Sequence, residues 1–520
     1  MRLSSELTLM LLLALLGGLT LRVPSPSPSR NIEGEVRDDD GPVAGAWVRL
    51  RGTSLLGRSD TRGAFRFPYS VSDRRVTAWK QGYFVGGSRL TSSPVIHLTR
   101  LPTKDDDEYK WIDPAPNAAE IHNCANCHAE IYREWLHSGH ARSATGRRFR
   151  NLYEGTDWQG NADIGWGLLR QYPDGAGVCA SCHAPTAKEY DLRHVQGVAE
   201  RGVHCDYCHK IEGVAEGTIG LAHGRFNLRL LRPSDGQVFF GPLDDVDRGE
   251  DAYSPLYRDS RYCASCHEGV IFGVHVYSTF SEWQASPAAR QGKQCQDCHT
   301  KPTGRMSNMA PGHGGIQRNP STLANHRFFD GSQQAMLRRA VKTSVRLERQ
   351  SDGVRAWVRL WVEDVGHRLP TGFVDRHLVL VVEGQAADGR TVPLRAGPKL
   401  PPLAGEELAG RPGRLFARVL RDFEGRSPVP FWLASPAAPS DTRLVPGKVE
   451  EELFDFPAAL SRLSLRVLYR RFWPEVARRK HWPNDDLVIL EQTFASQQMT
   501  GHLTPSPATL VPKKHARVSE

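Results

Sequence analysis

The chain has 520 residues, too many for one hydrophobic core, and the usual domain size predicts about three domains. Charged residues make up 24% and aromatic residues 8% of the sequence, so most of it can bury a core and disorder of the whole chain is excluded. The formal net charge is +9, but Lys and Arg are scattered rather than gathered in one stripe, which argues against nucleic-acid binding.

The first 30 residues have the pattern of an export signal. Arg2 precedes an apolar run from Leu7 to Leu21, which is too short for a comfortable membrane span. A Pro/Ser stretch from Pro24 to Ser29 follows, in place of a clean small-residue cleavage site. Residues 1–30 are therefore predicted to be a signal peptide or an uncleaved N-terminal membrane anchor. We expect the rest of the protein in the periplasm or otherwise exported.

Residues 31–102 have the pattern of a small β-sandwich. Short alternating strands are predicted at Gly34–Val36, Ala46–Leu50, Phe65–Phe67 and Val76–Trp79, with Gly/Asp turns between them. This segment resembles the carboxypeptidase regulatory-like module, and the resemblance implies a structural or adhesive accessory without catalytic residues. The acidic stretch Asp105–Glu108 is predicted to be a solvated linker.

Residues 110–333 contain all ten cysteines of the chain, arranged in five C-x-x-C-H units. In this motif the two thiols bond covalently to one haem and the following imidazole binds its iron as the proximal ligand. The predicted attachment residues are Cys124, Cys127, Cys179, Cys182, Cys205, Cys208, Cys263, Cys266, Cys295 and Cys298, and the proximal ligands are His128, His183, His209, His267 and His299. Short disulfides or zinc knuckles would not require a His after every pair. We therefore predict five covalent haems c.

The same region is rich in Gly and short helical patches, which favours a mainly helical and irregular cytochrome domain. The second motif starts 26 residues before the third, and the fourth starts 32 residues before the fifth, so we expect these motifs to bring their haems together in couples. Five ferric haems, each of charge about −1, would lower the formal +9 to about +4.

The ligand on the other side of each iron decides whether a haem only passes electrons or also binds a substrate. The haem region contains only two methionines, Met306 and Met309, so most of the haems must use His as distal ligand or stay open. The candidates are His122, His137, His140, His194, His204, His223, His275, His313 and His326. Against five irons this surplus favours coordination by two His.

The segment Glu134–His140 contains a W-x-x-S-x-H pattern that resembles the cytochrome c-554/c-552 family of multihaem cytochromes, as do Gly202–His209 and His326–Phe328. The resemblance implies His140 and His326 as distal ligands. Glu282–Ser286 echoes the first pattern, but Ala288 stands where the His would be. One haem is therefore left without an assigned distal ligand.

Residues 334–500 are predicted to form a C-terminal β-sandwich. A connecting helix is expected at Gln334–Thr343, followed by strands at Val354–Val362, His377–Val382 and Leu463–Tyr469. His367 lies in a polar loop that either reaches a haem or is a plain loop, and the plain loop is favoured. The tail, residues 501–520, is predicted to be disordered.

The predicted protein is therefore multidomain, with an N-terminal β-sandwich, a central mainly helical and irregular multihaem domain and a C-terminal β-sandwich. The favoured function is that of an exported pentahaem cytochrome that transfers electrons in a respiratory chain, with redox proteins or a membrane quinol-linked complex as partners. The alternatives are an oxidoreductase that acts on a nitrogen or sulfur oxyanion or hydroxylamine at one open haem, and an interaction protein that docks through its β-sandwiches.

Overall fold

The computed structural model describes residues 30–69, 75–175, 177–189, 191–328, 333–495 and 501–503. The predicted signal or anchor lies outside the described residues except for Arg30. The chain divides into two compact units, residues 1–101 with 243–253, and residues 102–242 with 254–520. In the described part of the chain, no helix is both long enough and apolar enough to cross a membrane.

The N-terminal unit contains two four-stranded sheets. The first is built around β1 (Arg30–Asp38), which pairs with β2 (Gly41–Pro42), β5 (Ala64–Tyr69) and β8 (Val95–His97). The second has the order β4 (Leu56–Arg58), β3 (Trp47–Leu50), β6 (Arg75–Trp79) and β7 (Gly86–Arg89). Apolar residues of both sheets, such as Val36 and Val48, are buried in one shared core. The strands predicted from the alternating pattern are confirmed.

A loop far along the chain, residues 243–253, completes this unit. Asp244 accepts two hydrogen bonds from Arg49, each 2.7 Å long. Asp247, whose side chain is 3% exposed, pairs with both Arg51 and Arg75. Buried carboxylates cost free energy unless they are paired, so these contacts hold the loop on the sheet.

The acidic stretch after the N-terminal unit is not simply a solvated linker. The Asp105 carboxylate accepts hydrogen bonds from the backbone N–H of Arg232 at 2.7 Å and from its Nε at 2.9 Å. The Arg232 guanidinium, which is nearly buried, also pairs with Asp107. The prediction failed here because the partner lies more than a hundred residues away.

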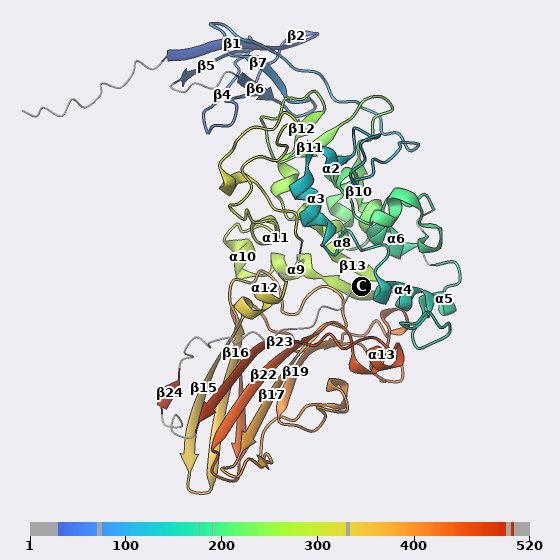
Figure 1. Cartoon of the computed structure of the whole chain (residues 1–520), viewed down its shortest axis with the longest axis vertical. Coiled ribbons are helices and arrows are strands. Elements are labelled where there is room, and N and C mark those ends of the chain that lie inside the picture. The colour runs from blue at the N-terminus through green and yellow to red at the C-terminus, as the bar shows by residue number, and fades with distance from the viewer. Residues whose placement is uncertain are drawn as a thin grey trace, which may run out of the picture. The chain divides into compact units, whose positions relative to one another are not determined.

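The central region consists of short helices and two-stranded hairpins connected by loops (Figure 1). The five motifs lie on or at α2 (Cys124–Cys127), α6 (Val178–His183), α7 (Cys205–His209), α8 (Arg261–His267) and α11 (Gln296–His299). The other helices are α3 (Ala129–Leu136), α4 (Arg147–Glu154), α5 (Leu168–Gln171), α9 (Thr279–Gln284) and α10 (Pro287–Arg290). The strands are β9 (Ile211–Val214), β10 (Leu228–Leu230), β11 (Phe239–Gly241), β13 (Glu268–Ile271) and β14 (Val274–Ser278), whereas β12 (Asp251–Tyr253) lies in the segment 243–253 of the N-terminal unit. Short 3-10 helices are η1 (Leu192–His194), η2 (Gly197–Arg201), η3 (Glu216–Thr218), η4 (Gly224–Asn227), η5 (Pro255–Arg258) and η6 (Pro320–Thr322).

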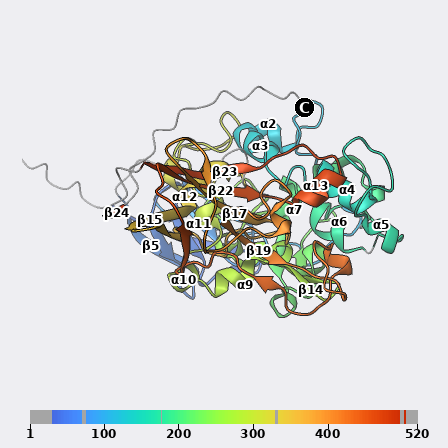
Figure 2. The same ribbon diagram turned by 90° about the horizontal axis from the view of Figure 1, so that it is seen from below.

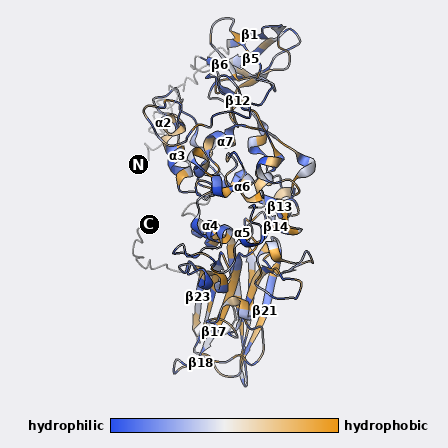
Figure 3. Cartoon of the chain, turned by 90° about the vertical axis from the view of Figure 1, so that its right-hand side faces the viewer, coloured by the Kyte–Doolittle hydropathy of each residue, from blue (hydrophilic) through white to orange (hydrophobic). Residues whose placement is uncertain are grey.

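The C-terminal region contains two larger sheets, and apolar residues recur along their strands (Figure 3). The four-stranded sheet has the order β21 (Val449–Phe456), β16 (Gly353–Val362), β15 (Val341–Gln350) and β24 (Gly501–Leu503). The six-stranded sheet has the order β20 (Ser440–Asp441), β19 (Gly413–Val419), β17 (His377–Gln385), β22 (Arg462–Arg470) and β23 (Leu487–Ala495), with β18 (Thr391–Val392) paired to β17. Helices α12 (Gln333–Ala340) and α13 (Pro474–Arg479) and the 3-10 helices η7 (Pro402–Ala404) and η8 (Phe431–Leu433) complete the region. Residues of both sheets, such as Val358 and Leu380, share one buried core.

Two predicted boundaries in this region differ from the structure. The connecting helix ends at Ala340 rather than Thr343, because Val341–Thr343 pair with residues of β16 and begin β15. Gly501–Leu503 pair with β15 as strand β24, so the sheet extends past residue 500 into the segment predicted to be disordered. The rest of that segment lies outside the described residues.

The C-terminal region packs directly against the haem region, since both belong to the second unit. Val274 and Val276 of β14 share a buried cluster with Leu420 and Val429. On another face, helix α13 lies beside α4 (Figures 1 and 2), where the Lys480 Nζ donates to the carbonyl of Asn151 at 3.0 Å. Side chains from the C-terminal region can therefore take part in the haem sites.

Candidate haem sites

Each C-x-x-C-H unit occupies a single helical turn. Residues three apart lie on the same face of a helix, so the two Cys of a motif point the same way. All ten cysteines are free thiols. In the described residues, no group of three or more His, Cys, Asp or Glu is arranged to hold a metal ion directly. Pairs of free thiols on one helix face fit the covalent attachment of a haem.

Three of the five imidazoles predicted as proximal ligands are oriented for iron binding. The Nδ1 of His128, of His183 and of His209 lies 3.0 Å, 3.0 Å and 2.6 Å from the backbone carbonyl oxygen of Met309, Ser143 and Phe240 respectively. An imidazole that donates Nδ1–H to a carbonyl keeps its Nε2 unprotonated, which is the form that binds a metal. The donor set at these motifs therefore fits haem.

Two of the proximal imidazoles face a second imidazole across a short gap. The ring centroids of His140 and His267 are 6.3 Å apart, and those of His299 and His367 are 6.2 Å apart. Two metal–nitrogen bonds of about 2 Å, with about 1 Å from each nitrogen to its ring centre, would place the centroids about 6 Å apart. Each pair therefore has the separation expected for two axial ligands of one iron.

His326 lies close to two other proximal ligands. Burial, together with the neighbouring His209 and His128, lowers its pKa to about 3. Its Nδ1 is buried without a hydrogen-bond partner. The centroid of the Phe328 ring lies 5.8 Å from that of His326 and 4.6 Å from that of His140. The two residues predicted as distal ligands thus share one aromatic neighbour, and their ligand role stays a prediction.

The other His residues predicted as possible distal ligands differ in burial and in hydrogen bonding. His204 is fully buried and neither of its ring nitrogens has a hydrogen-bond partner, and the buried Nδ1 of His223 also has none. Such groups are costly to bury unless they bind something. By contrast, four of the candidates have exposed side chains: His122, His137, His194 and His313. His275 is paired with Glu268 at 2.5 Å.

The attachment cysteines of different motifs contact one another. A hydrogen bond with Cys124 is the main cause that raises the pKa of Cys205. Corresponding thiol contacts join Cys182 to Cys266 and Cys263 to Cys295.

The fourth motif therefore contacts the second and the fifth, and Cys208 of the third also lies close enough to raise the pKa of Cys263 and Cys266. The expected coupling of the fourth motif with the fifth agrees with these contacts. The expected coupling of the second motif with the third stays a prediction: their thiols contact the fourth and first motifs, but Cys182 of the second motif also lies close enough to Tyr207 of the third to raise its pKa.

Comparisons with known proteins agree with this arrangement. Residues 123–210 match the family model of cytochrome c554 and c-prime. The structure is similar to that of a penta-haem cytochrome c552 from Thermochromatium tepidum, with 22% sequence identity and a TM-score of 0.53. The match covers 72% of this chain and 97% of that chain. A search of curated proteins found no match.

The five motifs, the family match and the shared fold together support a multihaem c-type cytochrome with five covalently bound haems c. The family model covers the first three motifs, and the fold match extends over most of the chain.

Proposed function

We propose that this chain is an exported pentahaem c-type cytochrome that transfers electrons and does not transform a substrate. The observation that carries the proposal is the pairing of His140 with His267 and of His367 with His299 at ligand distance. A haem c supplies one-electron exchange between ferric and ferrous iron. Two imidazoles leave the iron no open position for a substrate, so the paired residues favour electron transfer alone.

The chain's own residues would hold the five haems as follows. The five Cys pairs attach them, and His128, His183, His209, His267 and His299 bind the irons on the proximal side. His140 is proposed as the distal ligand opposite His267, and His326 as a distal ligand beside His209 or His128. The cysteines of the first motif contact the third, and the third lies beside the fourth, which contacts both the second and the fifth. These contacts would bring neighbouring haems together into a continuous electron path.

The flanking regions are proposed as accessories to this path. The two sheets of the N-terminal unit share one core, which supports a β-sandwich of the carboxypeptidase regulatory-like kind, and the C-terminal sheets share a second core. The boundaries 31–102 and 110–333 stay predictions, as does the start of the C-terminal region at 334, whereas its sheet extends past residue 500 through β24. Export, a signal peptide or anchor at residues 1–30, and redox proteins or a membrane quinol-linked complex as partners complete the proposal.

The proposal predicts how the reduced protein responds to carbon monoxide. Because paired imidazoles close the irons, we expect a predominantly low-spin spectrum with at most one carbon-monoxide-reactive haem. Nitrite, hydroxylamine and tetrathionate should not be turned over rapidly. Optical titration with carbon monoxide measures the number of reactive haems, and steady-state assays with a dye as electron donor measure the turnover of the three substrates. Stoichiometric carbon monoxide binding together with steady consumption of one of these substrates would establish the reductase instead.

A further inference from the structure

A short element occurs twice in the haem region, at Glu134–Ser138 and at Glu282–Ser286, and it has the same local structure both times. The Trp indole donates to a backbone carbonyl at 2.9 Å in each copy, that of Val203 from Trp135 and that of Lys293 from Trp283. The Ser hydroxyl of each copy accepts the N–H three residues later at 3.3 Å. An aromatic ring three residues before each Trp packs on it. The two segments are therefore structural repeats.

The Glu of each repeat binds a loop from far along the chain, and each loop carries a His. Glu134 accepts the backbone N–H of His326 at 2.8 Å. Glu282 accepts the backbone N–H of Arg368, the neighbour of His367, at 3.3 Å and the hydroxyl of Thr371 at 2.8 Å. The side chains of both Glu are 7% exposed. In both repeats a buried carboxylate thus holds a segment that carries a candidate ligand.

The repeats differ at the position six residues after the Glu. In the first repeat this position is His140, which faces His267. In the second it is Ala288, which has no ligand atom. The loop from the C-terminal region packs against this Ala: a Cβ placed on Gly366 would lie 3.4 Å from the Cβ of Ala288 and 3.4 Å from the Trp283 ring. His367 follows directly in the chain.

His367 has the geometry of a ligand. Its ring is nearly parallel to that of His299, with 16° between the planes and 6.2 Å between the centroids. Its Nδ1 lies 2.9 Å from the carbonyl oxygen of Arg368 and can donate to it, which leaves Nε2 as the metal-binding nitrogen. The sequence favoured a plain loop for His367, but a plain loop would not require its ring to lie opposite that of His299.

We propose that His367, supplied by the segment between β16 and β17, is the distal ligand of the fifth haem, and that Glu282 is its positioning residue. The C-terminal region thus completes a haem site in which the repeat has lost its own His at position 288. This inference rests on the proposed pentahaem cytochrome and adds one ligand assignment to it.

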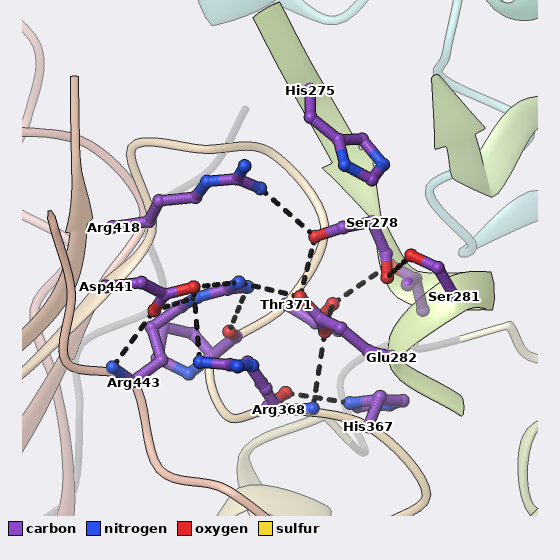
Figure 4. Close-up of polar contacts among 12 residues, drawn as sticks. His275, Ser278, Ser281, Glu282, His367, Arg368, Thr371, Arg418, Asp441 and Arg443 are labelled. Atoms are coloured by element: carbon purple, nitrogen blue, oxygen red, sulfur yellow. Dashed lines mark hydrogen bonds and ion pairs between the residues drawn. The ribbon is translucent and has the colours of Figure 1, made fainter. Parts of the chain in front are cut away.

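A buried ionic network fixes Glu282 in turn (Figure 4). The Arg443 guanidinium, with a side chain 6% exposed, lies 2.7 Å from the Glu282 carboxylate and 2.8 Å from that of Asp441. Asp441 also pairs with Arg368 at 3.3 Å. The Glu282 carboxylate accepts the hydroxyl of Ser278 at 2.6 Å as well. Arg418 is a third guanidinium beside this cluster and donates to the Ser278 hydroxyl at 3.2 Å. The ion pairs of Glu282 and Asp441 with Arg443 and Arg368 therefore tie the loop carrying His367 to the haem region.

The test uses the full-length holoprotein with His367→Ala, and His137→Ala as the matched control because the His137 side chain is exposed. Paramagnetic resonance of the oxidised protein should show one of the five haems converted from low spin to high spin in H367A and none in H137A. Added imidazole should restore the low-spin signal. Intact mass should still show five haems, so that loss of a ligand is distinguished from failure of haem attachment.

Two further variants separate ligation from folding and test the role of Glu282. His367→Met retains a ligand and should raise the reduction potential of one haem, as Met/His coordination does in cytochromes c. Glu282→Ala should give a mixture of low-spin and high-spin signals that Glu282→Gln, which can still accept the Arg368 N–H, largely restores. An H367A protein with five haems and an unchanged resonance spectrum overturns the ligand assignment and leaves the electron-transfer proposal standing. A wild-type protein with fewer haems overturns the proposed function itself.

Discussion

Replacing His140 by Ala should convert one of the five haems from low spin to high spin and make it reactive toward carbon monoxide. The His140 ring faces that of His267 at 6.3 Å, and burial lowers the pKa of His140 to about 3, so its imidazole is neutral and able to bind iron. Removing it leaves the iron of the fourth haem with one protein ligand. Paramagnetic resonance of the oxidised protein and optical titration of the reduced protein with carbon monoxide measure the two effects.

His137→Ala is the matched control for this variant, since it removes an exposed imidazole three residues earlier in the same segment. The control should keep the wild-type spectrum. If H140A keeps it too, with five haems still attached, the ligand opposite His267 must come from elsewhere and the 6.3 Å pairing would be incidental.

Removing the fourth attachment site, with Cys263→Ser and Cys266→Ser, should interrupt the electron path at its most connected point. The fourth motif contacts the second through Cys266 and the fifth through Cys263, and it lies beside Cys208 of the third. We expect intact mass to fall by one haem. Electron redistribution among the remaining haems, followed after rapid partial reduction, should slow by more than an order of magnitude.

The corresponding change in the first motif, Cys124→Ser with Cys127→Ser, provides the comparison. Cys124 of that motif contacts Cys205 of the third motif, and we place the first haem at an end of the proposed path. This variant should also lose one haem but keep fast redistribution among the other four. Equal rates in the two variants would mean that the fourth haem is not the junction of the path.

The attachment residues could be predicted from the sequence because their chemistry is local: two thiols and an imidazole within five residues define a haem site wherever they occur. The strands of both sheet-rich regions could be predicted for the same reason, since the alternation of buried and exposed residues is set by neighbours in the chain. His140 was implied by the resemblance of the W-x-x-S-x-H segment to the cytochrome c-554/c-552 family, and the structure places it opposite His267.

Contacts between distant segments of the chain could not be predicted from the sequence. His367 reaches His299 only because β16 and β17 place their connecting loop against Ala288. Cys182 of the second motif contacts Cys266 of the fourth, although the two motifs are not neighbours in the sequence. Asp105 accepts a hydrogen bond from Arg232, and Glu134 accepts one from the backbone of His326, each from more than a hundred residues away in the chain. The regular feature that could have indicated the role of Glu282 is its place in a repeat of Glu134.

The most direct test of the central claim is the intact mass of the mature protein, expressed in a host that attaches haem c and measured under denaturing conditions. Covalent haem survives denaturation, whereas haem held only by axial ligands does not. We expect a mass that exceeds that of the mature polypeptide by five haem units, one for each C-x-x-C-H motif. A mass equal to that of the unmodified polypeptide, or one with fewer than five haems, would contradict it.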